Sequence, residues 1–136
     1  MLIRRYQHID RRPLIDLWTQ VFNDQQPHNS PARMIDAKLA VDDLIFLALL
    51  GKQVVGGCMG GYDGHRGWLY AVAVLPQHRR NGTGAALVKE TIAALKSLGC
   101  IKVNLQIRSH NRQVADFYQS LGFNIEDRLS MGTLIT

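Results

Sequence analysis

The stretch that decides the fold is Leu69-Tyr-Ala-Val-Ala-Val-Leu-Pro76 followed by Gln77-His-Arg-Arg-Asn-Gly-Thr-Gly-Ala85. Its first half is an apolar run of strand length. Its second half is polar, contains glycines and leads into a helical pattern that ends near Leu98. We therefore predict a strand that passes through a glycine-bearing turn into a helix. At such a turn, free backbone N–H groups and the positive end of the helix dipole converge on one point.

This turn has the properties of a binding site for a phosphate or pyrophosphate group. Gly82 and Gly84 carry no Cβ, so a ligand can come close to the backbone. Arg79 and Arg80 add positive charge in a form that can donate two parallel hydrogen bonds to phosphate oxygens. A plain strand-to-helix turn with surface arginines is the alternative, because a helix N-terminus alone does not require a ligand.

Two common phosphate loops are excluded by the same residues. A Walker A loop needs Gly-Lys-Ser/Thr, but Gly84 is followed by Ala85 and Ala86. A dinucleotide fingerprint needs a third small residue where Leu87 stands, and an acidic residue about 20 positions further on. Neither condition is met.

The spacing Arg79-x-x-Gly82-x-Gly84 resembles the acetyl-CoA loop of the GNAT superfamily of N-acetyltransferases, which reads Gln/Arg-x-x-Gly-x-Gly/Ala after an apolar strand. A second match lies one helix and one strand downstream. It resembles the superfamily's Asn-(x6)-Tyr-x-x-x-Gly-Phe and consists of Asn111, Tyr118, Gly122 and Phe123. The segment Met59-Gly-Gly-Tyr-Asp-Gly-His-Arg-Gly67 further resembles a small bacterial group typified by YpeA.

The resemblance covers nearly the whole chain. It implies an acyltransferase that moves the acetyl group of acetyl-CoA to a primary amine. The acceptor class stays open between a small amine, an amino acid, a peptide, a protein and an aminoacyl-tRNA. Two other functions remain as alternatives, a non-catalytic CoA-binding or sensing module and a basic nucleic-acid-binding domain.

Length and composition indicate one domain over residues 1–136, because a chain of 136 residues with 46% hydrophobic residues can bury a core. No apolar stretch approaches the ~20 residues of a membrane span, and the first residues lack the apolar region of a signal peptide. Cys58 and Cys100 are expected to be buried free thiols. We therefore expect a cytoplasmic protein.

The net charge of +5 comes from arginines that occur in pairs. Without a long basic run, this charge gives only weak support for nucleic-acid binding. The histidines are scattered and no carboxylate–histidine cluster has ligand spacing, so we expect no metal. The only expected partners are acetyl-CoA, an amine acceptor and a second copy of the chain in a homodimer.

Apolar periodicity and turn residues predict the order βααβββαβαββ, which is the GNAT arrangement within the α/β (α+β) class. We expect a mixed sheet of six to seven strands with helices on both faces. The predicted strands are 2–7, 44–50, 54–62, 68–75, 101–107, 123–127 and 130–135. The predicted helices are 11–22 with Asp10 as its cap, 31–40 with Ser30 as its cap, 83–98 and 112–121.

The resemblance implies that the strands ending at Leu75 and Ile107 separate into a V that holds the cofactor. The pantetheine arm would then pair with the backbone of Val72, Ala73 and Val74, as an added strand does. The pyrophosphate would lie over Arg79, Arg80, Asn81, Gly82, Thr83, Gly84 and Ala85. Asn111 would cap its helix, bind CoA, or do both.

Tyr118 is the candidate acid, because the family places the matching tyrosine beside the CoA sulfur. A phenol with a pKa near ~10 can protonate a departing thiolate. The alternative role is an aromatic residue that packs on an amphipathic helix.

The general base is harder to identify. The resemblance implies a glutamate in the fourth or the fifth strand as the base. Here no acidic residue lies between Gly67 and Leu75, and the fifth predicted strand has Gln106 in place of a glutamate. Asp63 and His65, in the turn before the fourth strand, are the candidates, with Tyr70 beside them. A simple hairpin turn is the alternative for Asp63, and a solvated loop residue for His65. The resemblance also implies an acceptor groove lined by the first two helices and the loop between the last two strands, which here are about residues 23–34 and 126–130.

Overall fold

The computed structural model describes residues 1–24 and 26–135. The chain forms two compact units, Met1–Leu105 and Gln106–Thr136. The first unit contains a five-stranded sheet in the order β1-β2-β3-β4-β5. Its strands are β1 Leu2–Arg5, β2 Ile45–Leu50, β3 Gln53–Tyr62, β4 Gly67–Val74 and β5 Val103–Asn104. Its helices are α1 Arg11–Phe22, α2 Pro31–Leu39 and α3 Thr83–Ser97, and the second unit contains α4 Arg112–Ser120.

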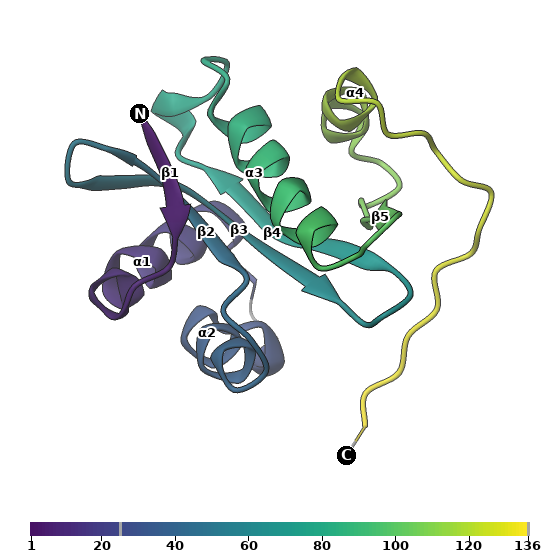
Figure 1. Ribbon diagram of the computed structural model, residues 1–136, viewed down its shortest axis with the longest axis horizontal. Coiled ribbons are helices and arrows are strands. Elements are labelled where there is room, and N and C mark those ends of the chain that lie inside the picture. The colour runs from purple at the N-terminus through teal and green to yellow at the C-terminus, as the bar shows by residue number, and fades with distance from the viewer. Residues whose placement is uncertain (25, 136) are drawn as a thin grey trace. The chain divides into compact units, whose positions relative to one another are not determined.

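The sheet is mixed, as predicted. Strands β1 to β4 pair antiparallel as a meander, whereas β5 pairs with β4 in parallel after the crossover through α3. Helix α3 covers one face of the sheet, and α1 and α2 lie on the other face (Figure 1). The predicted helices on both faces are therefore confirmed.

Glycines in β3 let the helices come close to the sheet on both faces. A Cβ on Gly56 would stand 2.8 Å from Leu87 Cδ1 of α3. On the opposite face, a Cβ on Gly57 would stand 2.8 Å from Leu14 Cδ1 of α1. Both distances are shorter than an ordinary contact, so a side chain at either position would force Leu87 or Leu14 to move, and the glycines allow the helices to pack closely on the sheet.

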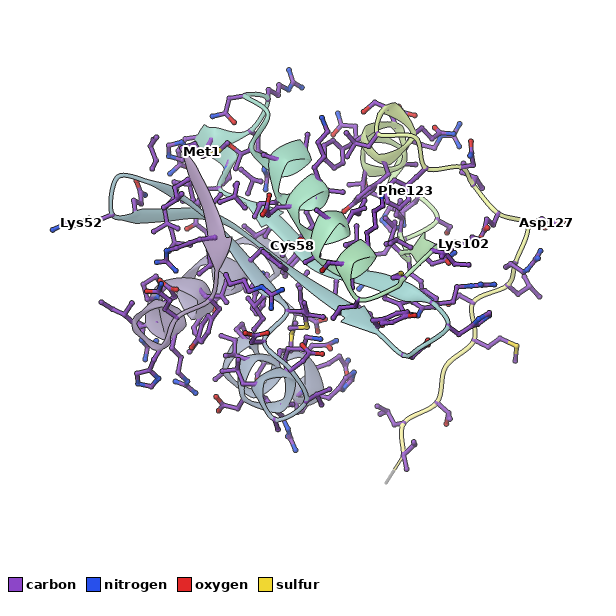
Figure 2. The ribbon with its side chains drawn as sticks, viewed as in Figure 1. Met1, Lys52, Cys58, Lys102, Phe123 and Asp127 are labelled. Atoms are coloured by element: carbon purple, nitrogen blue, oxygen red, sulfur yellow. The ribbon has the colours of Figure 1, made fainter. Side chains whose placement is uncertain are left out.

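Both cysteines are buried free thiols, as predicted. Cys58 lies between β3 and α3 (Figure 2), where the Thr91 hydroxyl lies 3.4 Å from its sulfur. Burial raises the pKa of the Cys58 thiol to about 12. Cys58 is therefore an uncharged core residue at physiological pH.

The prediction of six to seven strands was wrong, because the sheet has five. The predicted strands 123–127 and 130–135 do not form in the described part of the second unit, and the strand predicted at 101–107 is reduced to Val103–Asn104. A strand is stable only when a neighbouring strand takes up its backbone N–H and C=O groups. Apolar alternation within one segment does not reveal whether such a neighbour exists.

Asp10 stands at the start of α1, but its carboxylate does not cap this helix. It accepts hydrogen bonds from both terminal nitrogens of Arg4, at 2.7 and 2.9 Å, and from the Gln7 N–H at 2.7 Å. Burial acts to raise the pKa of Asp10, but the hydrogen bonds from Arg4 and Gln7 and the Arg4 charge hold it below its usual value. Ser30 likewise precedes α2 without a side-chain cap bond.

We expect Asp10→Asn to lower the free energy of unfolding by about 1–3 kcal/mol at pH 7, because it weakens charged hydrogen bonds at a buried position. The matched control is Asp16→Asn, since Asp16 forms only an exposed pair with Arg12 at 3.6 Å and should change stability by less than about 1 kcal/mol. Urea unfolding at several pH values measures both changes.

The contribution of Asp10 to the free energy of unfolding depends on pH, and the direction of this dependence follows from its lowered pKa. The folded-state pKa of Asp10 is lowered, so its contribution is complete above the unfolded-state pKa of about 3.9 and is lost as the pH falls through the folded-state pKa. The difference between wild type and Asp10→Asn should therefore shrink in acid. Equal losses in Asp10→Asn and Asp16→Asn would contradict this assignment.

Candidate active site

The loop between β4 and α3 has a backbone suited to an anion. A short 3-10 turn, Pro76–His78, leads into it, and α3 begins at Thr83. Arg80 and Gly82 have positive φ angles of 64° and 87°, whereas Asn81 and Thr83 do not. Alternating φ signs turn successive N–H groups toward one side, which is the geometry of an anion-binding nest.

Side chains hold this loop in place. Arg79 donates a hydrogen bond from Nε to the Val74 carbonyl at 2.9 Å, which ties the loop to the end of β4. The buried Thr83 hydroxyl lies 2.6 Å from Asn81 Oδ1, and the Thr83 N–H also donates to this oxygen. Arg79 therefore stabilises the loop in addition to its predicted role as a source of positive charge.

The two glycines of the loop, Gly82 and Gly84, differ in their backbone conformation. Gly82 has a φ of +87° and open space around it, so its backbone conformation is what excludes a side chain. Gly84 lies in the first turn of α3 and has no positive φ. The first helical bond, from the Ala86 N–H to the Gly82 carbonyl, leaves Gly84 and Ala85 among the N–H groups that precede it.

One edge of β4 is open beside this loop. β5 pairs with β4 only at Gly67 and Trp68, so the rest of β4 has no second neighbour within the described first unit. The Leu75 N–H donates to Val55 of β3, and bonded positions alternate along an antiparallel strand. The backbone groups of Val72 and Val74 therefore face the open edge. Arg79 reaches Val74 at this edge.

A β-bulge bends β4 at the centre of the open edge. Gly57 lies opposite Ala73 and Met59 opposite Tyr70, so Ala71 and Val72 together face one residue of β3. Ala71 has a φ of +52°, which is unusual for a residue with a side chain.

Trp18 of α1 holds this bulge through a hydrogen bond that its indole Nε1 donates to the Ala71 carbonyl at 2.9 Å. The role of Trp18 was not predicted. Its position on the apolar side of α1 indicated only core packing. The one available signal was that a buried indole N–H usually needs an acceptor.

Asp63 lies in the β3–β4 hairpin. Its Oδ1 accepts the N–H groups of Arg66 at 2.7 Å and His65 at 2.8 Å. The bonds from Arg66 and then His65 lower the pKa of Asp63, which makes its carboxylate a weaker proton acceptor. The hairpin joins β4 at Gly67, whereas the loop follows the opposite end of the strand. The structure therefore does not bring Asp63 and His65 to the loop, and their role as base stays a prediction.

Tyr70 lies directly before the bulge and is half exposed. Burial of part of its ring, followed by the charge of Asp63, raises the pKa of Tyr70. Its ring and the ammonium of Lys38 both lie within 4 Å of the point where a Gly61 Cβ would stand. Lys38 itself is paired with Asp42 at 2.9 Å. The Tyr70 ring and the Lys38 ammonium therefore lie on the same face of the sheet, beside Gly61.

In the second unit, the downstream motif forms one local structure. Asn111 caps α4 by accepting the Val114 N–H, which confirms the capping prediction. Gly122 has a φ of +96° and ends the helix, and the Phe123 N–H donates to the Tyr118 carbonyl at 3.1 Å. The Tyr118 ring is buried and meets Phe117 and Phe123 edge-on, at centroid distances of 4.9 and 5.5 Å. Its role as acid stays a prediction.

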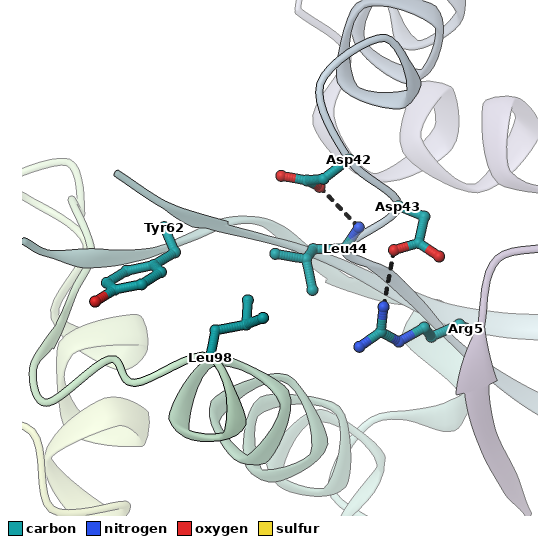
Figure 3. A pocket seen from close by; sticks show the side chains of 6 residues that line it. All are labelled: Arg5, Asp42, Asp43, Leu44, Tyr62 and Leu98. Atoms are coloured by element: carbon teal, nitrogen blue, oxygen red, sulfur yellow. Dashed lines mark hydrogen bonds and ion pairs between the residues drawn. The ribbon is translucent and has the colours of Figure 1, made fainter. Parts of the chain in front are cut away.

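A separate pocket of about 280 Å³ lies at the other end of α3 (Figure 3). Arg5 in its wall is paired with Asp43 at 2.8 Å, and Asp42 accepts the Leu44 N–H. The 15 residues of α3 span about 22 Å, so this pocket is far from the loop at the start of the helix.

Among residues 1–24 and 26–135, no three His, Cys, Asp or Glu side chains lie close enough together to hold a metal ion. Within the same residues, no helix has the length and apolar character needed to cross a membrane.

Comparisons with known proteins agree with this architecture. The model of the acetyltransferase (GNAT) family matches residues 11–123. An acetyltransferase of Sodalis glossinidius is 38% identical over 128 residues, which cover 93% of this chain and 89% of that protein.

Solved structures match the fold. The apo aminoglycoside 6'-N-acetyltransferase AAC(6')-Ig of Acinetobacter haemolyticus has a TM-score of 0.82 at 19% identity, over 100% of this chain and 99% of the other. The aminoglycoside N-acetyltransferase AAC(6')-Iy in complex with CoA has a TM-score of 0.84 at 19% identity, over 98% and 93%.

These findings define an acyltransferase with the GNAT fold. The chain belongs to the GNAT acetyltransferase family, because the family match spans most of it and the curated relative shares more than a third of its residues.

Proposed function

We propose that this acetyltransferase moves the acetyl group of acetyl-CoA to a primary amine. The observation that carries this proposal is the open, bulged edge of β4, which runs directly into the glycine-bearing loop before α3. A ligand with a peptide-like arm followed by a pyrophosphate, such as acetyl-CoA, matches the strand edge and then the loop, in that order. The CoA complex of a protein with the same fold supports the choice of cofactor.

The residues of the β4 edge and of the loop are assigned to the parts of acetyl-CoA that they would bind. The pantetheine arm pairs with the backbone at Val72, Ala73 and Val74, of which Val72 and Val74 face the open edge. The pyrophosphate is held by the loop and the first turn of α3, and Asn111 contributes as a CoA ligand as well as a cap. The loop ligands are Arg79, Arg80, Asn81, Gly82, Thr83, Gly84 and Ala85.

The reaction forms a C–N bond and breaks the C–S bond of the thioester. The neutral amine attacks the carbonyl, and a backbone N–H of β4 stabilises the resulting oxyanion. As the tetrahedral intermediate collapses, the sulfur leaves as a thiolate and takes a proton from the Tyr118 hydroxyl. The nitrogen loses its extra proton to a base.

We place Asp63 and His65 as the candidate bases, with a water relay to cover the distance along β4. Gly67 and Ala71 are four residues apart, or about 13 Å of strand. The lowered pKa of Asp63 keeps it ionised at neutral pH but also weakens it as a base. The pH–rate profiles of Asp63→Asn and His65→Ala decide this assignment.

We further propose that residues 1–136 act as one domain, in the cytoplasm, as a homodimer. The acceptor is a small amine, an amino acid, a peptide or a protein. A non-catalytic CoA-binding module and a nucleic-acid-binding domain are the competing functions. A screen of amines and peptides with acetyl-CoA that detects free thiol separates them, because neither alternative releases CoA.

We expect acetyl-CoA to raise the melting temperature. A ligand that binds only the native state adds about 2.7 kcal/mol of stability when its concentration is a hundredfold above its dissociation constant. Thermal scans with acetyl-CoA, NAD and ATP measure this effect, and free pyrophosphate should compete. No shift at millimolar acetyl-CoA would refute the cofactor assignment, and an equal shift with NAD or ATP would indicate another nucleotide site.

A further inference from the structure

The bulge in β4 leaves one peptide group outside the hydrogen-bond ladder with β3. Along an antiparallel strand, positions that bond to the neighbouring strand alternate with positions that face away from it. Counted from the backbone bonds at Leu75 and at the β3–β4 hairpin, Ala73 and Tyr70 are the bonded positions that flank the bulge. The peptide group that joins Ala71 to Val72 lies between them, outside this bonded pattern.

Trp18 holds this peptide group from one face of the sheet. Its side chain is 1% exposed, and its indole nitrogen, which can only donate, lies 2.9 Å from the Ala71 carbonyl oxygen. The bond turns this carbonyl toward the face that α1 covers (Figure 1). The peptide bond is planar and trans, so its C=O and its N–H point in opposite directions. The Val72 N–H is therefore turned away from α1.

The backbone at this point has an unfavourable conformation. Ala71 has a φ of +52°, which brings its Cβ too close to the following carbonyl oxygen, whereas glycine would adopt this angle freely. Such a conformation persists only where the surrounding structure imposes it, and it is concentrated at catalytic and ligand-binding sites. Here the bonded positions on both sides of the bulge and the bond from Trp18 impose it.

We propose that Trp18 is a positioning residue for acetyl transfer, because it holds the Val72 N–H in place to donate to the carbonyl oxygen of the bound thioester. This inference rests on the proposed function, in which acetyl-CoA lies along the open edge of β4. The thioester lies beyond the pantetheine arm as counted from the pyrophosphate. An arm that leaves the loop and follows β4 from its end therefore brings the thioester to the bulge.

The contribution of Val72 to the reaction is a hydrogen bond without proton transfer. When the amine attacks, the C–N bond forms and the π electrons of the thioester carbonyl move onto its oxygen. The Val72 N–H donates to this negatively charged oxygen. When the C–S bond breaks, the C=O bond forms again and the sulfur leaves with the electron pair.

A donor that is held in place before the substrate binds does not have to reorganise during the reaction. Trp18 touches neither acetyl-CoA nor the amine in this arrangement, so it acts only through the peptide group of the bulge. A purely structural role makes a different prediction. If the bond only satisfies a buried indole, its loss should lower stability and leave the rate unchanged.

The first test observes the Val72 N–H directly, in amide NMR spectra of the labelled full chain with acetyl-CoA and with CoA, which has no acyl carbonyl. We expect the Val72 amide proton of the wild type to move downfield with acetyl-CoA relative to CoA. Trp18→Phe should bind both ligands but lose this difference. Equal positions of the Val72 signal in the two wild-type complexes, or an unchanged difference in Trp18→Phe, overturn the proposal.

This test needs no amine acceptor, so it separates the inference from the proposed activity. A wild type that binds neither ligand would refute the cofactor assignment, and with it this inference. If Trp18→Phe does not fold, benzothienylalanine at position 18 takes its place, because it keeps the shape of the indole and has sulfur where the N–H was.

The second test separates the turnover number from the Michaelis constant, with an acceptor found in the amine screen. Displacement of a catalytic group by about 1 Å can cost about 100-fold, so Trp18→Phe should lower turnover by about 10- to 100-fold. The Michaelis constant for acetyl-CoA should change little, because the bond to the oxyanion forms in the transition state.

The matched control is Leu14→Val, which removes volume from the same helix. Leu14 is fully buried and packs at Gly57 of β3. The control should lose stability and keep the turnover of the wild type. A wild-type turnover in Trp18→Phe, or an equal loss of turnover in folded Leu14→Val, overturns the positioning role.

Discussion

Tyr118→Phe should reduce turnover by about 10²–10⁴-fold, the usual effect of removing a positioned acid. The substitution keeps the ring, so the edge-on contacts with Phe117 and Phe123 survive and α4 should remain folded. Only the hydroxyl that would protonate the thiolate is lost. The Michaelis constant for acetyl-CoA should change little, because an interaction made only in the transition state does not contribute to substrate binding.

The matched control is Tyr62→Phe. The Tyr62 hydroxyl lies 3.3 Å from the Gly64 carbonyl in the hairpin, and its removal should leave turnover unchanged. Steady-state kinetics with a thiol readout measures both variants, and circular dichroism checks that they fold. A wild-type rate in Tyr118→Phe would make Tyr118 a packing residue, and a large rise in the Michaelis constant would make it a CoA ligand instead.

Local patterns predicted the helices and the long strands well. Helices α1, α2, α3 and α4 each lie within about two residues of their predicted bounds, because periodicity and terminal residues such as Gly99 and Gly122 act within the helix itself. The meander β2-β3-β4 was predictable for the same reason, since each turn lies between the two strands that it joins.

Features that depend on distant residues were not predictable. The bulge at Ala71 exists because β3 and β4 differ by one residue between two pairing positions, and because Trp18 supplies a donor from another element. The binding of Asp10 to Arg4, in place of α1, follows from the path of β1. The missing strands after Phe123 show the same limit, because a strand pattern specifies a face but not a partner.

The same difference between local features and features that depend on distant residues applies to the candidate site. The loop from Arg79 to Ala85 was predictable, because its chemistry is a property of a strand, a turn and a helix that follow one another in sequence. The open edge of β4 was expected from the family resemblance alone. The general base was not found, because proton transfer depends on a position in space that no spacing in this sequence marks.

The second large effect that we expect is the loss of acetyl-CoA binding when Gly84 in the loop is replaced, in the variant Gly84→Val. Gly84 lies in the first turn of α3 without a positive φ, and valine has a better helix propensity than glycine, so α3 should persist. The branched side chain would stand where the phosphate oxygens approach the N–H groups. We expect the dissociation constant for acetyl-CoA to rise more than 100-fold, on the order of 3 kcal/mol, as measured by calorimetric titration.

Gly84→Val tests whether a ligand approaches the backbone more directly than a substitution at Gly82 does. At Gly82 the φ of +87° strains any side chain, so weaker binding in Gly82→Val would combine an altered backbone with a blocked site. The control Ala93→Val adds the same side chain on the exposed side of α3, more than two turns from the loop, and should bind acetyl-CoA as the wild type does. If Gly84→Val is folded and binds normally, the phosphates do not approach the start of α3, and the glycine serves only the turn. If Gly84→Val and Ala93→Val lose binding equally, the effect arises from α3 as a whole and not from the loop.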